Sequence, residues 1–369
     1  MAKKKILIWH WGRRGGGPRY TFELARALLA QDAFELHLSL SRQSEIFDEF
    51  YALGAPSFHV DTYTNLPGAL LATLRLPWLR RRFWRYVRAQ NIDAVVCTMS
   101  HVWNVPVLAG RKNKTPYLLV LHDALPHPGD DVFLRHALLQ REIGYTDGVV
   151  TLTDYVRGLL CNDYGYPPAR SWVVPHGVFP YALPAAAQKN GTVRLLFFGR
   201  ILPYKGLGLL LEAYAMLRAE DYAVELTVCG AGDMRPYAGL LGGVTMDNRW
   251  IAESDIGPIF QQADICVLPY VEASQSGVIA TAYAAGVPVV VTPTGGLVEQ
   301  VKHEQTGLIC ADISAASIAA ALRRMLDEPG LRSRCAQGAL REANDALAWP
   351  AIARKFGEAV QQMLAMGKR

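Results

Sequence analysis

Residues 264–299 constrain the fold of this chain most strongly. Two short runs rich in β-branched residues, Asp264 to Leu268 and Val287 to Val291, are bounded by Gly or Pro. The small residues from Ser276 to Ala285 between them have the composition of a helix. The order strand, loop, helix, strand is that of a βαβ unit in a parallel sheet. This stretch therefore predicts a domain in which helices cover a buried parallel sheet.

The same stretch carries no charged residue from position 273 to position 298, which would also suit a membrane span. Repeated Gly, Pro and polar residues interrupt it, so a buried helix and strand are the better interpretation. The loop from Ser274 to Gly277 lies between the carboxyl end of the strand and the amino end of the helix, where backbone amides and the helix dipole attract an anion. Glu272 lies at the same edge. The pattern indicates a phosphate-bearing ligand with hydroxyl groups for Glu272.

Length and composition indicate two folded α/β domains, because the 369 residues are 51% apolar and 19% charged. The six cysteines have no CxxC or metal-type spacing, and no secretory signal follows Lys5, so we expect a reduced, cytoplasmic chain. Residues 1–185 hold 21 Lys/Arg and 15 Asp/Glu, a net charge of +6, whereas residues 186–369 hold 17 and 18, a net charge of −1. If either half faces an acidic partner or surface, it is the first.

The first 180 residues alternate strands and helices. Ile6 to Trp9 predicts an opening strand, and the glycine-rich turn from Gly12 to Gly17 leads into a helix that runs to Leu29. The turn lacks the GxGxxG pattern, and no acidic residue follows the second strand, Glu35 to Leu40, so a dinucleotide site is not expected. The turn is either a flexible connection or a place where the backbone approaches a ligand. Further strands are expected at 94–99, 117–122, 148–153 and 172–174, and helices near 43–53, 131–145 and 154–163.

Residues 181–192 are rich in Ala, Pro and Gly and are expected to form a linker. A second alternation follows, with strands at 195–198 and 224–229, a helix ending near Arg218 and another at 255–263. The sequence therefore predicts two doubly wound domains, 1–180 and 193–349, with ligand-type loops at strand ends and a cleft between them.

The order and spacing of these motifs resemble the retaining glycosyltransferases of family 4. That family has the GT-B architecture, in which two Rossmann-like domains face each other, and the resemblance covers nearly the whole chain. In the family a closing helix crosses back to the first domain, and residues 350–369 are similar to it. The motifs that carry the resemblance are Gly15–Gly17, His122–Asp123, Pro175–Val178, Gly199–Arg200, Lys205–Gly206, Gly230–Gly232, Asp264–Pro269, Ala285–Val290 and Gly295–Glu299.

The resemblance implies roles for three of the polar residues. Arg200 and Lys205 would bind the diphosphate of the donor, where fixed cations stabilise the charge that develops as the glycosyl phosphate bond breaks. Taken alone, both would more often be solvated surface charges. His122 would lie beside the reacting sugar carbon, although a single histidine that ends a strand is commonly structural. His176 is interpreted as a residue of the domain hinge.

The E-x7-E motif of the family is only half present. Glu272 resembles its first acid, near the donor sugar hydroxyls, whereas alignment backward from Ala285–Gly286 places Thr281 where the second Glu normally holds the ribose. If Thr281 occupies the ribose-binding position, Thr281→Glu should be tolerated, whereas loss of folding would place this side chain in the core. Glu299 is an alternative ribose contact. The residues expected to bind the nucleotide are Gly16, Gly17, Gly230, Ser276, Gly277, Val278 and Thr281.

The expected reaction moves a sugar from a nucleotide-diphosphate sugar to an acceptor hydroxyl with retention. No DxD motif occurs, so no metal and no cofactor beyond the donor are expected. No carboxylate pair for double displacement is evident, which favours front-face transfer. The alternatives are a GT-B epimerase, a phosphorylase for which only Lys302 is a candidate Schiff-base lysine, and a non-catalytic nucleotide-sugar binding protein. No nucleic-acid partner is expected.

Residues 66–90 suggest where the acceptor is met. Six arginines alternate with apolar residues there, and helical spacing places Leu76, Leu79, Phe83 and Val87 on one side, as in a segment within a lipid headgroup layer. The alternative is a helix packed on the first sheet with a solvated basic side. With the net charge of +6 and the lipid-linked acceptors frequent in the family, we expect peripheral contact with an anionic membrane at its inner face. The acceptor would be a saccharide on a polyprenyl diphosphate carrier, or alternatively a soluble molecule.

Overall fold

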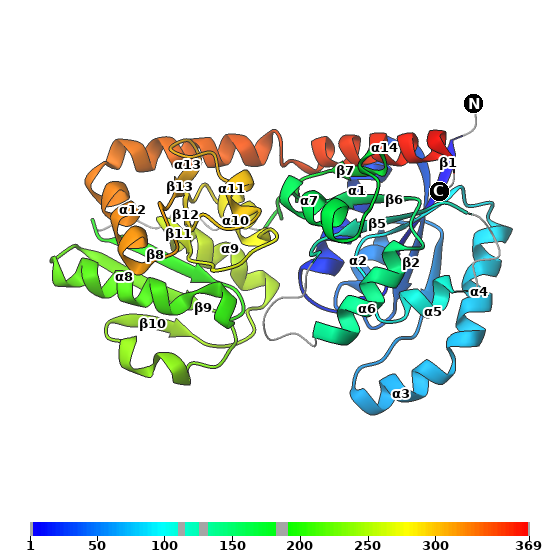
Figure 1. Ribbon diagram of the computed structural model, residues 1–369, viewed down its shortest axis with the longest axis horizontal. Helices are drawn as coiled ribbons and strands as arrows, with labels where there is room; N and C mark the ends of the chain where they lie inside the picture. The colour runs from blue at the N-terminus through cyan, green and yellow to red at the C-terminus, as the bar shows by residue number, and fades with distance from the viewer. Residues whose placement is uncertain (1–2, 110–114, 125–131, 182–190, 368–369) are drawn as a thin grey trace. The chain divides into compact units, whose positions relative to one another are not determined.

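The computed structural model describes residues 3–109, 115–124, 132–181 and 191–367, which form two compact units (Figure 1). Unit 1 contains the described residues up to 175 and residues 349–367, and unit 2 contains residues 176–181 and 191–348. Most of the expected linker, 181–192, lies outside the described residues.

Unit 1 is built on a parallel sheet with the strand order β3-β2-β1-β4-β5-β6-β7 among the described residues. Every strand predicted from the sequence is present, and β3 was not predicted. The inner strands β1, β4, β5 and β6 are almost wholly buried, as expected where helices cover both faces of a parallel sheet. The strands are β1 Lys4–His10, β2 Phe34–Ser41, β3 Ser57–Val60, β4 Ala94–Cys97, β5 Tyr117–Leu121, β6 Gly148–Thr151 and β7 Ser171–Val173.

The helices of unit 1 come from both ends of the chain. They are α1 Gly16–Gln31, α2 Phe47–Ala52, α3 Leu66–Leu74, α4 Leu76–Ala89, α5 Asn104–Leu108, α6 Val132–Ile143, α7 Asp154–Asp163 and α14 Trp349–Met366. The last of these, red in Figure 1, packs against α1 and β6. The side-chain amide of Gln31 in α1 donates to the carbonyl oxygen of Pro350 at 2.6 Å. The C-terminal segment is thus part of unit 1.

Helix α4 corrects one expectation from the sequence. Its apolar side, including Phe83 and Val87, is buried in the core of unit 1, and the indole N–H of Trp84 donates to the carbonyl oxygen of Val107 at 2.9 Å. The prediction that this side faces lipid is therefore wrong, because protein already covers it. The alternative, a helix packed on the sheet with a solvated basic side, is confirmed. No helix within the described residues is long and apolar enough to cross a membrane.

Unit 2 is built on a second parallel sheet, with the strand order β10-β9-β8-β11-β12-β13 among the described residues. Its strands are β8 Val193–Phe198, β9 Val224–Cys229, β10 Val244–Asp247, β11 Ile265–Leu268, β12 Val289–Val291 and β13 Gly307–Ile309. Its helices are α8 Leu207–Ala219, α9 Glu253–Gln262, α10 Gly277–Ala284, α11 Leu297–Gln300, α12 Ala315–Asp327 and α13 Pro329–Asn344. The predicted βαβ unit is β11-α10-β12, with Cys266 paired to Val289.

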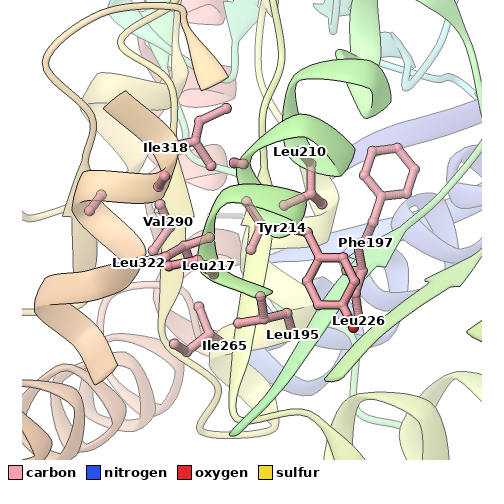
Figure 2. Close-up of a cluster of buried hydrophobic side chains, with 14 of the residues drawn as sticks. Leu195, Phe197, Leu210, Tyr214, Leu217, Leu226, Ile265, Val290, Ile318 and Leu322 are labelled. Carbon is pink, nitrogen blue, oxygen red and sulfur yellow. The ribbon is translucent and has the colours of Figure 1, made fainter. Parts of the chain in front are cut away.

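Alternate residues of each strand in unit 2 face opposite sides of the sheet. Leu195 and Phe197 of β8 join Tyr214 of α8 and Leu322 of α12 in one buried cluster, which Figure 2 shows. Leu196, between them in the sequence, belongs to a second cluster with residues of α10 and α13. Helices therefore cover both faces of the sheet, and the predicted doubly wound α/β architecture is confirmed for each unit.

Candidate functional site

In unit 2, the loops that follow β8 and β11 lie side by side because these two strands are neighbours in the sheet. The backbone N–H of Val271 donates to the carbonyl oxygen of Tyr204 at 2.9 Å and joins the two loops. Gly206 has a φ of +66°, and a Cβ atom there would lie 1.9 Å from the carbonyl oxygen of Pro269. Only glycine fits this close approach. Because the strand order reverses between β8 and β11, this edge is where ligands bind in doubly wound sheets.

Two cationic side chains lie on the first of these loops. Arg200 is exposed and lies two residues after β8. Lys205 is half-buried, with its Nζ atom 3.8 Å from the ring centroid of Tyr270 and 5.3 Å from that of Tyr204. The two positive charges therefore occupy the edge of the sheet at which the sequence predicted a diphosphate site.

The amino end of α10 lies on the second loop and supplies a backbone donor. The Ser276 Oγ atom accepts the N–H of Val278 at 3.3 Å, and the Oε1 atom of Gln300 accepts the N–H of Ser276 at 2.8 Å. Gln300 also donates to the carbonyl oxygen of Ser276 at 3.2 Å. Among the described residues, the Gly277 N–H has no hydrogen-bond acceptor. Of the three predicted contacts at this helix end, Gly277 is thus the one with an N–H available for an anion.

The two halves of the incomplete E-x7-E motif lie in different surroundings. Glu272 is half-buried on the loop that precedes α10. Thr281, within α10, is 6% exposed and donates its hydroxyl to the carbonyl oxygen of Gly277 at 3.0 Å. Its hydroxyl is therefore engaged inside the helix. Glu299, the alternative ribose contact, is exposed on α11.

Gly230, a predicted nucleotide contact, lies where the backbone after β9 packs closely against the backbone after β8. Its φ is +142°, and a Cβ atom there would lie 2.0 Å from the carbonyl oxygen of Gly199. The side chain of Asn248, after β10, binds the backbone N–H of Gly232 at 3.0 Å and its carbonyl oxygen at 3.1 Å. The ends of β8, β9 and β10 are thus held together, and contact between Gly230 and a nucleotide stays a prediction.

In unit 1, His122 lies at the end of β5 and is 9% exposed. Its Nε2 atom is 2.9 Å from the carbonyl oxygen of Thr98, so Nε2 carries the proton and Nδ1 is left as an acceptor. Burial lowers the pKa of His122, against the opposing effects of Asp123 and of the bond to Thr98. Burial, with His101 and His122 nearby, also lowers the pKa of His10 to about 3. These imidazoles are therefore neutral at physiological pH.

The amino end of α1 packs onto the same edge of unit 1. Gly15 has a φ of +84°, and its N–H donates to the Oε1 atom of Glu45 at 2.8 Å. A Cβ atom on Gly17 would lie 2.8 Å from the Sδ atom of Met99, whereas one on Gly16 would meet no atom within 4 Å. A side chain at Gly17 would thus displace Met99, whereas Gly16 leaves the backbone open to approach.

The structure brings Arg200, Lys205 and Gly277 to one edge of unit 2, with Ser276, Val278, Glu272 and Thr281 on the same loop and helix. Gly16, Gly17 and His122 lie at the carboxyl edge of the sheet in unit 1. Sequence reasoning missed Tyr270 and Gln300. The position of Tyr270, two residues after a strand of the central unit, was the one signal for it. Within the described residues, no group of His, Cys, Asp and Glu side chains is arranged to hold a metal ion.

Two family models match the chain. The model described as Glycosyltransferase Family 4 matches residues 14–180, and the model described as Glycosyl transferases group 1 matches residues 192–328. An uncharacterized glycosyltransferase of Methanocaldococcus jannaschii is 25% identical over 252 residues, which are 61% of this chain and 63% of that protein. The chain thus spans less than two thirds of the length of this relative.

Solved structures match over almost the full chain. The sucrose-phosphate synthase of Thermosynechococcus elongatus has a TM-score of 0.76 and 19% identity, and the match covers 99% of this chain and 100% of that one. A protein of Anabaena in complex with UDP-glucose has a TM-score of 0.75 and 16% identity, over 97% and 99% of the two chains. These likenesses, together with the two parallel sheets, confirm the predicted fold class, GT-B with two Rossmann-like domains.

Proposed function

Because the chain belongs to the glycosyltransferases of group 1 and family 4, we propose that it transfers a sugar from a nucleotide-diphosphate sugar to an acceptor hydroxyl with retention at the anomeric carbon. The observation that supports this most is the meeting of Arg200, Lys205 and the Gly277 N–H at one edge of unit 2. Two cations and a helix amino end suit a diphosphate. The Anabaena protein of similar fold binds UDP-glucose, which is a donor of this class.

The proposed mechanism is a front-face transfer. The bond between the anomeric carbon and the phosphate oxygen breaks, and its electron pair stays on the diphosphate, where Arg200, Lys205 and the Gly277 N–H stabilise the charge. The acceptor oxygen bonds to the anomeric carbon on the same face and passes its proton to the departing phosphate oxygen. Since its Nδ1 atom is a hydrogen-bond acceptor, His122 would orient a sugar hydroxyl rather than donate a proton. Glu272 would accept hydrogen bonds from other donor hydroxyls.

For the acceptor, we propose a lipid-linked saccharide of bacterial surface polysaccharide synthesis, reached at the inner face of the cytoplasmic membrane. The support is the exposed basic side of α4, where Arg81, Arg82 and Arg85 lie in solvent and the Cζ atom of Arg82 is 4.5 Å from the ring centroid of Trp78. Trp78 is 58% exposed, and an aromatic ring beside arginines suits an anionic headgroup layer. A soluble acceptor is the alternative.

The first experiment identifies the donor and tests the diphosphate clamp. Thermal shifts with UDP-, GDP- and ADP-sugars find the nucleotide, since a ligand that binds only the folded state raises the midpoint. With that donor, Arg200→Ala and Lys205→Ala should each lower turnover by at least ~10²-fold, as loss of one transition-state donor does. Arg218→Ala, exposed on α8, is the matched control and should keep wild-type turnover. Near-normal turnover in both clamp variants would refute the clamp.

The products then separate the enzyme classes. A transferase releases free nucleoside diphosphate only when acceptor is present, whereas an epimerase releases an isomerised sugar and a binding protein releases nothing. Proton NMR of the glycoside gives the anomeric configuration. A product of inverted configuration would overturn the retaining mechanism.

A further inference from the structure

Tyr270 links the two halves of the candidate diphosphate site. It is 1% exposed and follows β11 by two residues. The face of its ring lies 3.8 Å from the Nζ atom of Lys205, and its hydroxyl oxygen is 3.4 Å from the Oγ atom of Ser276, at the start of α10. One buried side chain therefore contacts both the cation and the helix end.

The backbone around Tyr270 is fixed on both sides. Thr292 donates its hydroxyl to the carbonyl oxygen of Tyr270, and the next residue, Val271, donates its N–H to the carbonyl oxygen of Tyr204. On the far side of the hydroxyl, Gln300 holds the backbone of Ser276 through both of its amide atoms. These hydrogen bonds fix the position of the Tyr270 ring, whereas the Lys205 side chain that contacts it has a flexible stem of four carbons.

An ammonium group over an aromatic face is attracted by the negative potential of that face, most strongly where water is excluded. A lysine held in this way loses less conformational freedom when an anion arrives than one that moves freely in solvent. A tyrosine at this position therefore suits the preorganisation of a cation for a ligand.

We infer that Tyr270 is a positioning residue, whose ring holds the Lys205 ammonium beside the amino end of α10 so that the lysine and the Gly277 N–H bind the same diphosphate. The inference rests on the proposed function and deepens it. In this role, Tyr270 aligns the Lys205 ammonium with the amino end of α10.

The test replaces Tyr270 by phenylalanine and by 4-fluoro-, 3,5-difluoro- and 3,4,5-trifluorophenylalanine, which weaken the potential of the ring face while nearly preserving its shape. The probes are UDP and inorganic pyrophosphate, whose Kd values are measured by calorimetry at one pH and ionic strength. We expect Tyr270→Phe to weaken binding by less than ~3-fold and the trifluoro ring to weaken it by about 10-fold, in steps with each fluorine. A role in packing alone would give no such gradient.

Two controls accompany the series. The same substitutions at Tyr214, which is 2% exposed in the core of unit 2 and donates to the carbonyl oxygen of Gly243 at 3.0 Å, should leave both Kd values unchanged. In a Lys205→Ala background the fluorine gradient at Tyr270 should vanish. Circular dichroism of each variant confirms that it is folded.

A Kd that stays constant across the fluorine series, or that falls with added fluorine, would overturn the inference about Tyr270. The diphosphate site would still be supported in that case if the wild-type protein binds the probes and Arg200→Ala does not. Failure of the wild-type protein to bind either UDP or pyrophosphate would instead remove the diphosphate site itself, and the inference with it.

Discussion

Thr281 shows how one residue decides whether the incomplete acidic motif can be restored. Its hydroxyl is bound to the carbonyl oxygen of Gly277 one turn earlier, and its side chain is 6% exposed. A glutamate there would place a longer, charged group among buried neighbours. The sequence alone predicts that Thr281→Glu is tolerated, whereas its surroundings in the structure favour the opposite outcome.

We therefore expect Thr281→Glu to lower the free energy of unfolding by roughly 2–4 kcal/mol, because a carboxylate would lose its hydration without a partner. Urea denaturation followed by circular dichroism measures this. Thr281→Ser, which keeps the hydroxyl, is the control and should stay within about 1 kcal/mol of wild type. Wild-type stability together with tighter binding of nucleoside diphosphate would place the side chain at the ribose after all.

At this scale, the sequence predicted the residues whose position follows from one strand and one loop. Arg200, Lys205 and Gly277 each follow a strand end, so their presence at the edge of the sheet could be expected. Tyr270 also follows a strand end, but its role and that of Gln300 could not be found in this way, because they depend on contacts between separate loops, such as the pair Ser276 and Gln300, 24 residues apart. Local patterns carry no record of such contacts.

At the scale of elements, most strands with apolar runs were predicted, including the edge strand β7, whereas the edge strands β3, β10 and β13 were missed. β3 and β10 end their sheets in the described residues, and each is four residues long with polar side chains between the apolar ones. A strand paired on one side only needs less apolar character, so its signal resembles that of a loop. For α4, periodicity identified correctly which residues share a side. It could not tell whether lipid or protein covers that side.

With the apolar side of α4 buried, the proposed membrane contact would depend on charge. If α4 contacts an anionic membrane surface, the contact would be made by its exposed arginines, each contributing about 1 kcal/mol. We expect the protein to co-sediment with phosphatidylserine-containing vesicles at low salt and to be released at high salt, with little binding to neutral vesicles. Arg80/Arg81/Arg82→Ser should abolish the pelleting.

The matched control removes the same charge from unit 2, as Arg218/Arg334/Arg341→Ser on surface helices, and should pellet like wild type. Equal, negligible pelleting of wild type and the α4 variant with both kinds of vesicle would favour a soluble acceptor. Equal strong pelleting of all three proteins would show that the basic side of α4 is not the contact.

At the scale of the whole molecule, the alternation of strands and helices was enough to predict two doubly wound sheets. The two units resemble each other in strand order, since in each the first strand lies in the middle and the order reverses beside it. What alternation could not show is how each sheet is completed. Unit 1 needs a helix from the other end of the chain, and only the resemblance to the family indicated it.

The last prediction follows from the buried side of α14. Trp349, Ile352, Phe356, Val360 and Met363 are each at most 6% exposed, and a Cβ atom on Gly148 of β6 would lie 3.0 Å from the Sδ atom of Met363. At about 1.5–3 kcal/mol for each large buried side chain, α14 contributes on the order of 10 kcal/mol, as much as the whole stability of a typical domain.

A chain that ends at residue 348 should therefore lose the folded state of unit 1. The cores of unit 2 contain no residue of α14 among the described residues, so unit 2 should still unfold cooperatively and should still be stabilised by UDP. Calorimetry of the truncated and full chains, with and without UDP, separates the two units. Phe356→Leu, which keeps α14 but reduces its contact, should lower only the transition that UDP does not shift. If the truncated chain shows the same two unfolding transitions as the full chain, the packing of α14 against α1 and β6 is not needed for unit 1 to fold.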